Sequence, residues 1–219
     1  MARGRLVTIE GIDGAGKSTL AESLAHEIAL RGMTVELLRE PGGVVVSERL
    51  RELVKDATLE IDARTETLLY AAARAQLVHE RLNPLLAGGT LVLLDRFVDS
   101  SLVYQGAGRG MGIEQVRAVN LFATAGLTPD RTLLLSIAPA AGHARQQLRG
   151  GAPDRLEREG EDFFATIAAA YEELALEQPD RIRPIDATQS RERVLHEALR
   201  AIEDLLVIPS PPPAQRPRS

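Results

Sequence analysis

A glycine-rich segment near the start of the chain carries the residues best suited to chemistry. It fits the pattern G-x-x-x-x-G-K-[ST] and runs Gly11-Ile12-Asp13-Gly14-Ala15-Gly16-Lys17-Ser18-Thr19. Glycines let successive backbone N–H groups face phosphate oxygens, Lys17 can reach the β- and γ-phosphates, and the Ser18 hydroxyl can ligate Mg²⁺. Because a strand pattern precedes the segment and a helix pattern follows it, the segment predicts a nucleoside triphosphate site rather than a glycine-rich turn without a ligand.

The loop alone leaves the reaction open, since GTPases, motor and partition ATPases and small-molecule kinases all share it. The base-reading Asn-Lys-x-Asp motif of a GTPase needs a second suitable lysine, and the chain has only Lys17 and Lys55. Val54 stands before Lys55, where that motif needs asparagine. The sequence therefore argues against a GTPase.

Three further segments place charged or aromatic residues where they could form a second half of a site. Arg39 follows an apolar strand pattern and precedes Glu40-Pro41-Gly42-Gly43, so it can fork onto a phosphate or simply form a surface Arg–Glu pair. Tyr70 and Arg74 are four residues apart on a predicted helix and share a face, although helical spacing alone favours a core tyrosine under a surface arginine. Asp95 ends an apolar strand pattern, as a Mg²⁺-holding carboxylate or a helix N-cap does.

In this order, the segments resemble the thymidylate kinase family from about Arg5 to Val194. The most specific stretch is similar to the family's D-R-[YF]-x-x-S-x-x-A-Y-Q-G, with Val103 where alanine is usual, and runs Asp95-Arg96-Phe97-Val98-Asp99-Ser100-Ser101-Leu102-Val103-Tyr104-Gln105-Gly106. The resemblance implies transfer of the γ-phosphoryl group of ATP to thymidine monophosphate (dTMP), with Mg²⁺ as cofactor. It also implies a P-loop kinase fold and a homodimer.

The resemblance assigns roles at the matching positions. Lys17, Arg96 and Asp13 are implied in catalysis, with Asp13 toward the acceptor sugar's 3′-hydroxyl or the Mg²⁺ that Ser18 and Asp95 hold. Arg39 and Arg96 are implied to bind the acceptor phosphate. The residues implied at the acceptor base and sugar are Tyr70, which stacks on thymine, Arg74, which bonds a base oxygen, Ser101, Gln105, and Tyr104, which excludes a ribose 2′-hydroxyl.

Another set of arginines lies in a segment that resembles the lid of the bacterial branch of the family, Arg145-Gln146-Gln147-Leu148-Arg149-Gly150-Gly151-Ala152-Pro153-Asp154-Arg155-Leu156-Glu157. Since Ala15 replaces the arginine that other branches carry in the loop, the lid is expected to supply the catalytic arginine. Arg149 is the expected residue, while Arg145 and Arg155 are alternatives that would contact ATP. A solvated basic helix end is the competing interpretation.

The segment Asp186-Ala187-Thr188-Gln189-Ser190 resembles the family's loop over adenine, which places Gln189 in the ATP site. Ser190 as a helix N-cap explains the same segment locally. Two other functions stay open: a deoxynucleoside kinase with Glu40 as base, and a P-loop ATPase switch or partition protein. An acceptor phosphate needs no base, because its second pKa near 6 leaves it largely ionised at pH 7.

Composition limits these possibilities. The 219 residues suffice for one α/β domain, and the net charge of −5 argues against nucleic-acid or membrane partners. The chain has no cysteine for disulfides or thiolate metal sites, and no apolar run long enough for a membrane span. Its first residues, Met1-Ala2-Arg3-Gly4-Arg5, lead directly into a strand pattern and leave no room for a signal peptide, so a cytoplasmic protein is expected. We expect one domain over residues 1–208, with a lid at about 145–160 and a disordered Pro/Arg-rich tail at 209–219.

Strand patterns alternate with helix patterns along the chain. The expected strands are Leu6–Ile9, Thr34–Leu38, Leu91–Leu94, Thr132–Leu135 and Ile182–Ile185. The expected helices are about Lys17–Arg31, Ser47–Lys55, Arg64–Ala87, Glu114–Ala125, Ala140–Leu148, Phe163–Gln178 and Arg193–Leu206. The apolar strands predict a five-stranded parallel sheet with helices on both faces, and a site at the carboxyl ends of the strands.

Overall fold

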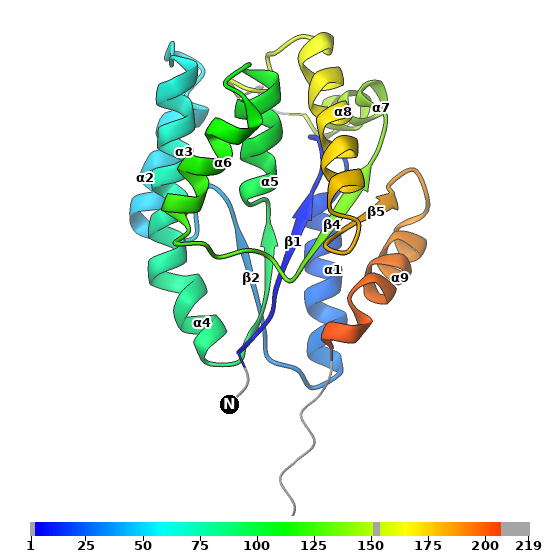
Figure 1. Cartoon of the computed structure of the whole chain (residues 1–219). Coiled ribbons are helices and arrows are strands. Elements are labelled where there is room, and N and C mark those ends of the chain that lie inside the picture. The colour runs from blue at the N-terminus through cyan, green and yellow to red at the C-terminus, as the bar shows by residue number, and fades with distance from the viewer. Residues whose placement is uncertain (1–2, 151–153, 207–219) are drawn as a thin grey trace, which may run out of the picture.

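The computed structural model describes residues 3–150 and 154–206, apart from the side chain of Arg149. Its centre is a five-stranded parallel sheet in the order β2-β3-β1-β4-β5 (Figure 1). The strands are β1 (Leu6–Glu10), β2 (Val35–Arg39), β3 (Leu91–Asp95), β4 (Arg131–Ser136) and β5 (Ile182–Asp186). The predicted α/β fold with five parallel strands is therefore confirmed.

Helices cover both faces of the sheet. They are α1 (Lys17–Leu30), α2 (Val45–Lys55), α3 (Ala63–Leu77), the π-helical η1 (Val78–Leu82), α4 (Asn83–Ala87), α5 (Val98–Ser101), the π-helical η2 (Leu102–Gly108), α6 (Ile113–Ala123), α7 (Pro139–Arg149), α8 (Glu161–Glu177), α9 (Arg191–Ala201) and the 3₁₀ turn η3 (Glu203–Leu205). Helix α1 packs on β2 and β3 beside α9, whereas α8 packs on β4 and β5 beside η2 (Figure 1). In the described part of the chain, no helix has the length and apolar character needed to cross a membrane.

The three central strands, β3, β1 and β4, form because they are largely apolar and covered on both sides. Every residue of β1 is buried, as are the first four of β3 and the first five of β4. The strand register then decides what meets at the carboxyl edge: Asp95 of β3 lies opposite Ile9 of β1 and Arg39 of β2. The loop after β1, the arginine that ends β2 and the aspartate that ends β3 are thereby neighbours, at the edge where open parallel sheets bind ligands.

Three elements differ from the expectation. The segment predicted as one helix, Arg64–Ala87, is α3, η1 and α4 in succession. Pro84 has no N–H for the helical ladder, and the π-helical turn lies directly before it. The final helix ends at Ala201 rather than Leu206, because Ile202 leaves the helical region at φ −119°. The segment after β3, for which we expected no particular element, forms α5 and η2.

The expected domain limits are only partly described. The predicted lid comprises the last turn of α7, residues 151–153, and the turns that lead to α8 at Glu161. Residues 151–153 and the predicted tail at 209–219 lie outside the described residues.

Candidate functional site

The glycine-rich loop joins β1 to α1 and depends on its glycines. Gly11, Gly14 and Gly16 have φ values of 138°, 79° and 98°, in the region that favours glycine. A Cβ at Gly14 would also lie 2.1 Å from the Gly142 carbonyl oxygen. Helix α1 begins directly after the loop, and no side chain caps its first N–H groups. These groups are therefore positioned to bind an anion.

Lys17 is the first residue of α1 and lies under the loop. Its Nζ donates to the Ile12 carbonyl at 2.9 Å and lies 3.9 Å from the Asp13 carboxylate. Burial and the nearby Arg96 guanidinium lower the pKa of Lys17 to about 8, although Asp13 acts in the opposite direction. A bound phosphate would favour the charged ammonium and offset this burial.

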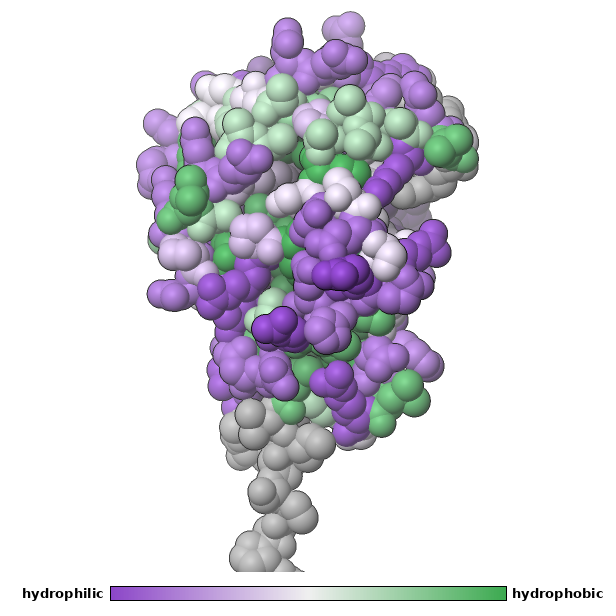
Figure 2. Space-filling model, turned by 90° about the vertical axis from the view of Figure 1, so that its right-hand side faces the viewer, coloured by the Kyte–Doolittle hydropathy of each residue, from purple (hydrophilic) through white to green (hydrophobic). Residues whose placement is uncertain are grey.

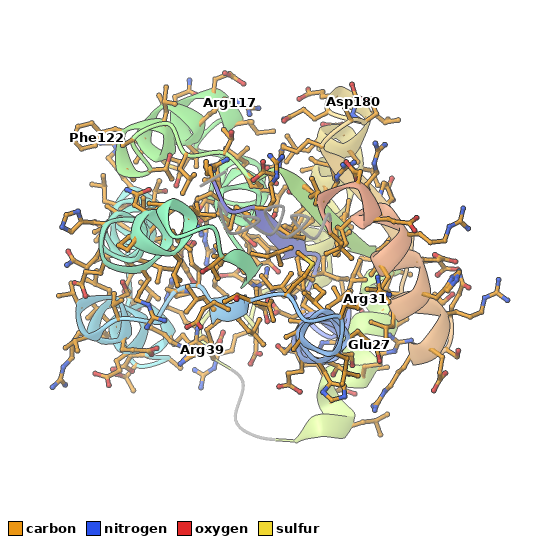
Figure 3. The ribbon with its side chains drawn as sticks, turned by 90° about the horizontal axis from the view of Figure 1, so that it is seen from below. Glu27, Arg31, Arg39, Arg117, Phe122 and Asp180 are labelled. Atoms are coloured by element: carbon orange, nitrogen blue, oxygen red, sulfur yellow. The ribbon has the colours of Figure 1, made fainter. Side chains whose placement is uncertain are left out.

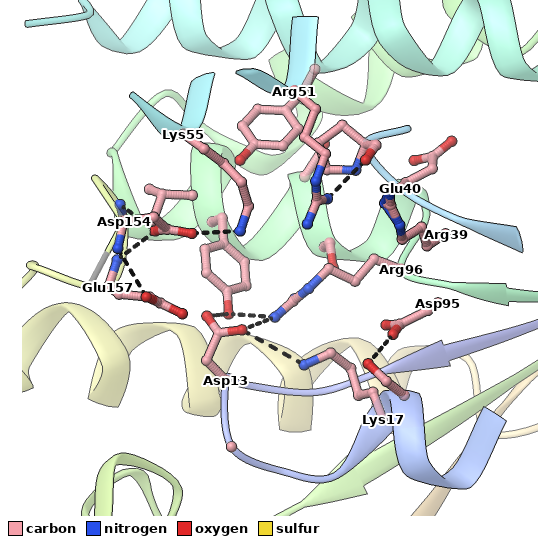
Figure 4. Close-up of a pocket in the computed structure, with 18 of the residues that line it drawn as sticks. Asp13, Lys17, Arg39, Glu40, Arg51, Lys55, Asp95, Arg96, Asp154 and Glu157 are labelled. Atoms are coloured by element: carbon pink, nitrogen blue, oxygen red, sulfur yellow. Dashed lines mark hydrogen bonds and ion pairs between the residues drawn. The ribbon is translucent and has the colours of Figure 1, made fainter. Parts of the chain in front are cut away.

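Ser18 and Asp95 meet at the junction of α1 and β3. The Ser18 hydroxyl donates to Asp95 Oδ2 at 2.8 Å (Figure 4). A hydroxyl and a carboxylate at this distance offer the oxygen ligands that Mg²⁺ prefers, and both residues line a cavity beside the loop. The pair predicted as metal ligands is thus brought together.

Arg96 projects from a strained turn directly after β3. Its φ of 69° is unusual for a residue with a side chain. The guanidinium is 2.6 Å from Asp13, 3.1 Å from the Ser100 hydroxyl and over the Tyr104 ring, 5.0 Å from its centroid. Although burial alone would raise it, the charges of Arg96 and Lys17 lower the pKa of Asp13 to about 2. Asp13 is therefore a carboxylate that orients both cations.

Glu10 lies beneath that turn, and sequence reasoning did not select it. It is fully buried and accepts from the Phe97 N–H at 2.7 Å, the Ser100 hydroxyl at 2.6 Å and the Tyr171 hydroxyl at 2.8 Å. Burial, and then the nearby Asp99, raise the pKa of Glu10. A glutamate at the end of a buried strand was a detectable signal, because such a residue needs partners.

The cavity beside the loop, which we call the first cavity, has a volume of about 330 Å³. Of the predicted residues, its lining includes Asp13, Gly14, Gly16, Lys17, Ser18, Thr19, Arg39, Tyr70, Arg74, Asp95, Arg96, Ser101, Tyr104 and Gln105. Every residue predicted for the acceptor is therefore at this cavity. Gly11 and Ile12 are absent from its described lining.

Two cations at the first cavity were missed from the sequence. Arg51 of α2 lines it and donates to the Pro41 carbonyl at 2.8 Å, and Lys55, one turn further, pairs with Asp154 at 2.7 Å (Figure 4). Arg39 is half exposed and pairs with Glu48 at 2.9 Å. The spacing of Arg51 and Lys55 on one helix face was the available signal, but a solvated face has the same spacing.

Arg74 is buried at the back of the first cavity, 2 % exposed, rather than lying over the surface. Its Nε donates to Glu40 at 2.8 Å, and its terminal nitrogens donate to Ser101 at 2.9 Å, to the Phe97 carbonyl at 2.9 Å and to Asn120. A base oxygen would therefore have to share one of these N–H groups. Burial raises the pKa of Glu40 to about 7, with the charge of Arg74 acting against it.

A second cavity lies on the other side of the loop. Its lining includes Ala15, Arg145 and Gln189, as predicted for the ATP side. Arg145 donates to the Ala187 carbonyl at 2.9 Å. Arg155 is elsewhere: it contacts Glu66 at 2.6 Å and the Val54 carbonyl at 3.1 Å, because the turn after residue 153 packs against α2 and α3. The side chain of Arg149 lies outside the described residues.

Comparisons with known proteins agree with this geometry. The family described as "Thymidylate kinase" matches residues 9–198. A thymidylate kinase of Latilactobacillus sakei is 46% identical over 202 residues, covering 91% of this chain and 94% of the relative, and one of Oenococcus oeni is 46% identical over 211 residues, covering 94% and 98%. The crystal structure of thymidylate kinase from Ehrlichia chaffeensis matches with a TM-score of 0.74 at 25% identity, covering 91% of this chain and 99% of that one. The chain therefore belongs to the thymidylate kinase family.

Proposed function

We propose that this protein transfers the γ-phosphoryl group of ATP to dTMP, giving dTDP and ADP. The observation that carries the proposal is that the two cavities meet at the loop, with Gly14, Gly16 and Thr19 lining both. A donor phosphate chain on the loop would thus end where the first cavity presents Arg39 and Arg96. Two substrates approach from opposite sides, which a hydrolytic switch protein would not need.

The chemistry asks these residues for alignment and charge neutralisation. The acceptor phosphate is largely ionised at pH 7, so no proton has to be removed before it attacks. Arg96 and Arg39 would hold it in line with the donor, and Lys17 would bind the β- and γ-phosphates. Mg²⁺, held by Ser18 and Asp95, would bridge phosphate oxygens and neutralise developing charge.

Thymidine would occupy the inner part of the first cavity. Tyr70 and Arg74 lie one helical turn apart on α3 and both line it, which suits stacking on the base and contact with its edge. Tyr104 donates to Asp13 at 3.3 Å, so ring and carboxylate are held together beside the position expected for the sugar. Asp13 would then accept from the 3′-hydroxyl, and the Tyr104 ring would exclude a 2′-hydroxyl.

The decisive assay measures ADP release with ATP and Mg²⁺ and each of dTMP, dUMP, dCMP, dGMP and thymidine. We expect the highest kcat/KM with dTMP and no turnover of thymidine. Preference for thymidine would instead indicate a deoxynucleoside kinase that uses Glu40. ADP release that no acceptor stimulates would indicate an ATPase.

We also propose that the protein is a homodimer through α2, α3 and α6, which pack side by side (Figure 1). Large apolar side chains are exposed on all three: Val45 (77%), Leu68 (54%), Leu121 (62%) and Phe122 (91%). Phe122 points away from the body of the protein in Figure 3. The face on the side of α7, α8 and α9 is mixed, with hydrophobic residues across its upper part and mostly hydrophilic ones below (Figure 2). Exposed apolar surface of this kind marks an association site.

Sedimentation analysis would test the dimer. We expect the wild type to sediment as a dimer and Leu121→Ser/Phe122→Ser to shift it toward a monomer. The matched control is Leu176→Ser on α8, where a highly exposed leucine (82%) lies outside the proposed interface. A wild-type monomer at micromolar concentration would contradict the proposal.

A further inference from the structure

Gln105 on η2 is almost completely buried and lines the first cavity. Its amide donates through Nε2 to Glu66 Oε1 at 2.8 Å. In the described residues, the amide oxygen of Gln105 accepts no hydrogen bond. The side chain therefore has its donor group committed to the protein and its acceptor group unused at a cavity wall.

The partner, Glu66 of α3, decides which end of that amide faces it. Glu66 is completely buried and ion-paired with two arginines, Arg155 at 2.6 Å and Arg109 at 3.3 Å. Two guanidinium groups pair with its carboxylate, and a carboxylate that is ion-paired in this way accepts hydrogen bonds and donates none. A reversed Gln105 amide would bring two acceptors together in a buried site, which is unfavourable. The orientation of Gln105 is thus dictated by Glu66.

We propose that Glu66 is a positioning residue that makes the first cavity selective for thymine and uracil over cytosine. This inference rests on the proposed function. The N3 atom of thymine and of uracil carries a hydrogen and donates, whereas N3 of cytosine carries a lone pair and accepts. The Gln105 oxygen, turned toward the cavity by Glu66, matches the first and repels the second.

The side chains next to Gln105, Arg74 and Ser101, do not distinguish thymine from cytosine. The donors of Arg74 are already engaged by Glu40, Ser101, Asn120 and the Phe97 carbonyl. Because Arg74 donates to the Ser101 oxygen, the Ser101 hydroxyl hydrogen is available for a base carbonyl, a group that thymine and cytosine both possess. Neither residue separates the two pyrimidines at N3.

The test compares kcat/KM for dTMP and dCMP in the full-length protein. In Glu66→Gln the new amide can donate or accept, so Gln105 can turn to suit either base. We expect the dTMP/dCMP ratio to fall on the order of 10- to 100-fold, the effect of a mispaired buried hydrogen bond. The control, Arg109→Gln, removes one ion pair from the same carboxylate but leaves its bond to Gln105, so the ratio should stay within about threefold.

A swapped pair gives the sharper readout and does not depend on the single variant's folding. In Glu66→Gln/Gln105→Glu, residue 66 donates and residue 105 presents a carboxylate oxygen to the base, so selectivity for dTMP should return. A loss of packing alone would not be reversed by this exchange. An unchanged ratio in Glu66→Gln, or no recovery in the swapped pair, would overturn the inference. Failure of the proposed function would appear separately, as a wild type that does not phosphorylate dTMP.

Discussion

The loop that would carry the donor phosphates is built from main chain, whereas the first cavity is lined by charged side chains that already pair with one another. In the loop, three glycines and the uncapped start of α1 expose N–H groups, and Lys17 is the buried cation. In the first cavity, Arg96 pairs with Asp13, Arg39 with Glu48 and Arg74 with Glu40. The donor side therefore recognises phosphate generically, while the acceptor side is shaped to discriminate.

The difference between the loop and the first cavity also predicts where positive charge for the transferring phosphoryl group is lacking. Main-chain N–H groups and one lysine must face a triphosphate, and Ala15 adds no charge to the loop. The acceptor side has cations, but Arg96, Arg39 and Arg74 are each paired with a carboxylate within the protein. A further cation for the transferring phosphoryl group would come from the lid segment, whose Arg145 already lines the second cavity.

The largest expected effect follows from this point. Arg149→Ala should lower kcat on the order of 10³-fold, as loss of an arginine that stabilises phosphoryl-transfer charge does, while the Kd of ATP changes little. Stopped-flow turnover and calorimetric ATP binding would check this. The control, Arg158→Ala, removes an exposed lid arginine that donates to the Ala57 carbonyl. Unchanged turnover in Arg149→Ala would reject the role and return attention to Arg145.

On the acceptor side, the pairs should matter for folding as well as for binding. Arg74→Met leaves Glu40 buried without its partner and should lower the free energy of unfolding by about 3–5 kcal/mol in urea titrations. The loss should grow as pH rises above about 7. Below this pH, Glu40 is protonated in the folded state of both proteins. Above it, the wild-type carboxylate ionises beside Arg74, whereas the variant lacks the charge that lowers the Glu40 pKa and must keep a proton that the unfolded state releases near 4.5.

The matched double variant Arg74→Met/Glu40→Leu removes both charges and should recover most of that stability. Equal destabilisation of the single and the double variant would show that packing, rather than the unpaired carboxylate, sets the cost. A difference in stability between wild type and single variant that shrinks as pH rises above 7 would contradict the assigned effect of Arg74 on the Glu40 pKa.

How readily each region was predicted from the sequence follows the same division. The donor loop is contiguous, and its glycines, Lys17 and Ser18 stand at spacings that only a phosphate loop needs. The strands and their parallel arrangement were predictable because the centres of β1, β3 and β4 are short, mostly apolar runs that alternate with helix patterns. Local sequence carries enough information for both.

The acceptor side depends on contacts between distant segments. Glu66 and Gln105 are 39 positions apart and Glu10 and Tyr171 are 161 apart, so spacing gave no sign of either pair. Arg155 was expected with ATP, yet the fold of the turn before α8 brings it to Glu66. The resemblance identified most of the residues that line the first cavity. Only the structure shows which hydrogen bonds and ion pairs fix their side chains in position.

Arg96 tests whether the acceptor side works independently of the loop. Arg96→Ala should lower kcat/KM for dTMP about 10²-fold, because it removes a partly buried cation from the acceptor phosphate, while the KM of ATP stays within a few-fold. Steady-state kinetics with each substrate varied in turn would check this. Arg31→Ala, an exposed arginine at the end of α1 (Figure 3), should change neither. Equal losses for the two substrates would mean that the two sides are not separable.

The smallest expected effect concerns the one buried side-chain charge of the donor loop. Below pH 8 the Lys17 amine is charged before ATP arrives; above its pKa of about 8, a proton must be taken up on binding. The Kd of ATP should therefore rise up to tenfold per pH unit between pH 8 and 9.5, and calorimetry would show it. Adenosine, which lacks phosphates, should bind equally at these pH values.

In Lys17→Arg the guanidinium stays charged over this pH range, so the dependence of the ATP Kd on pH should vanish even if affinity falls. A wild-type Kd of ATP that does not change with pH would mean that main-chain N–H groups alone bind the triphosphate. The donor loop would then recognise phosphate entirely through main chain, in contrast to the charged side chains of the first cavity.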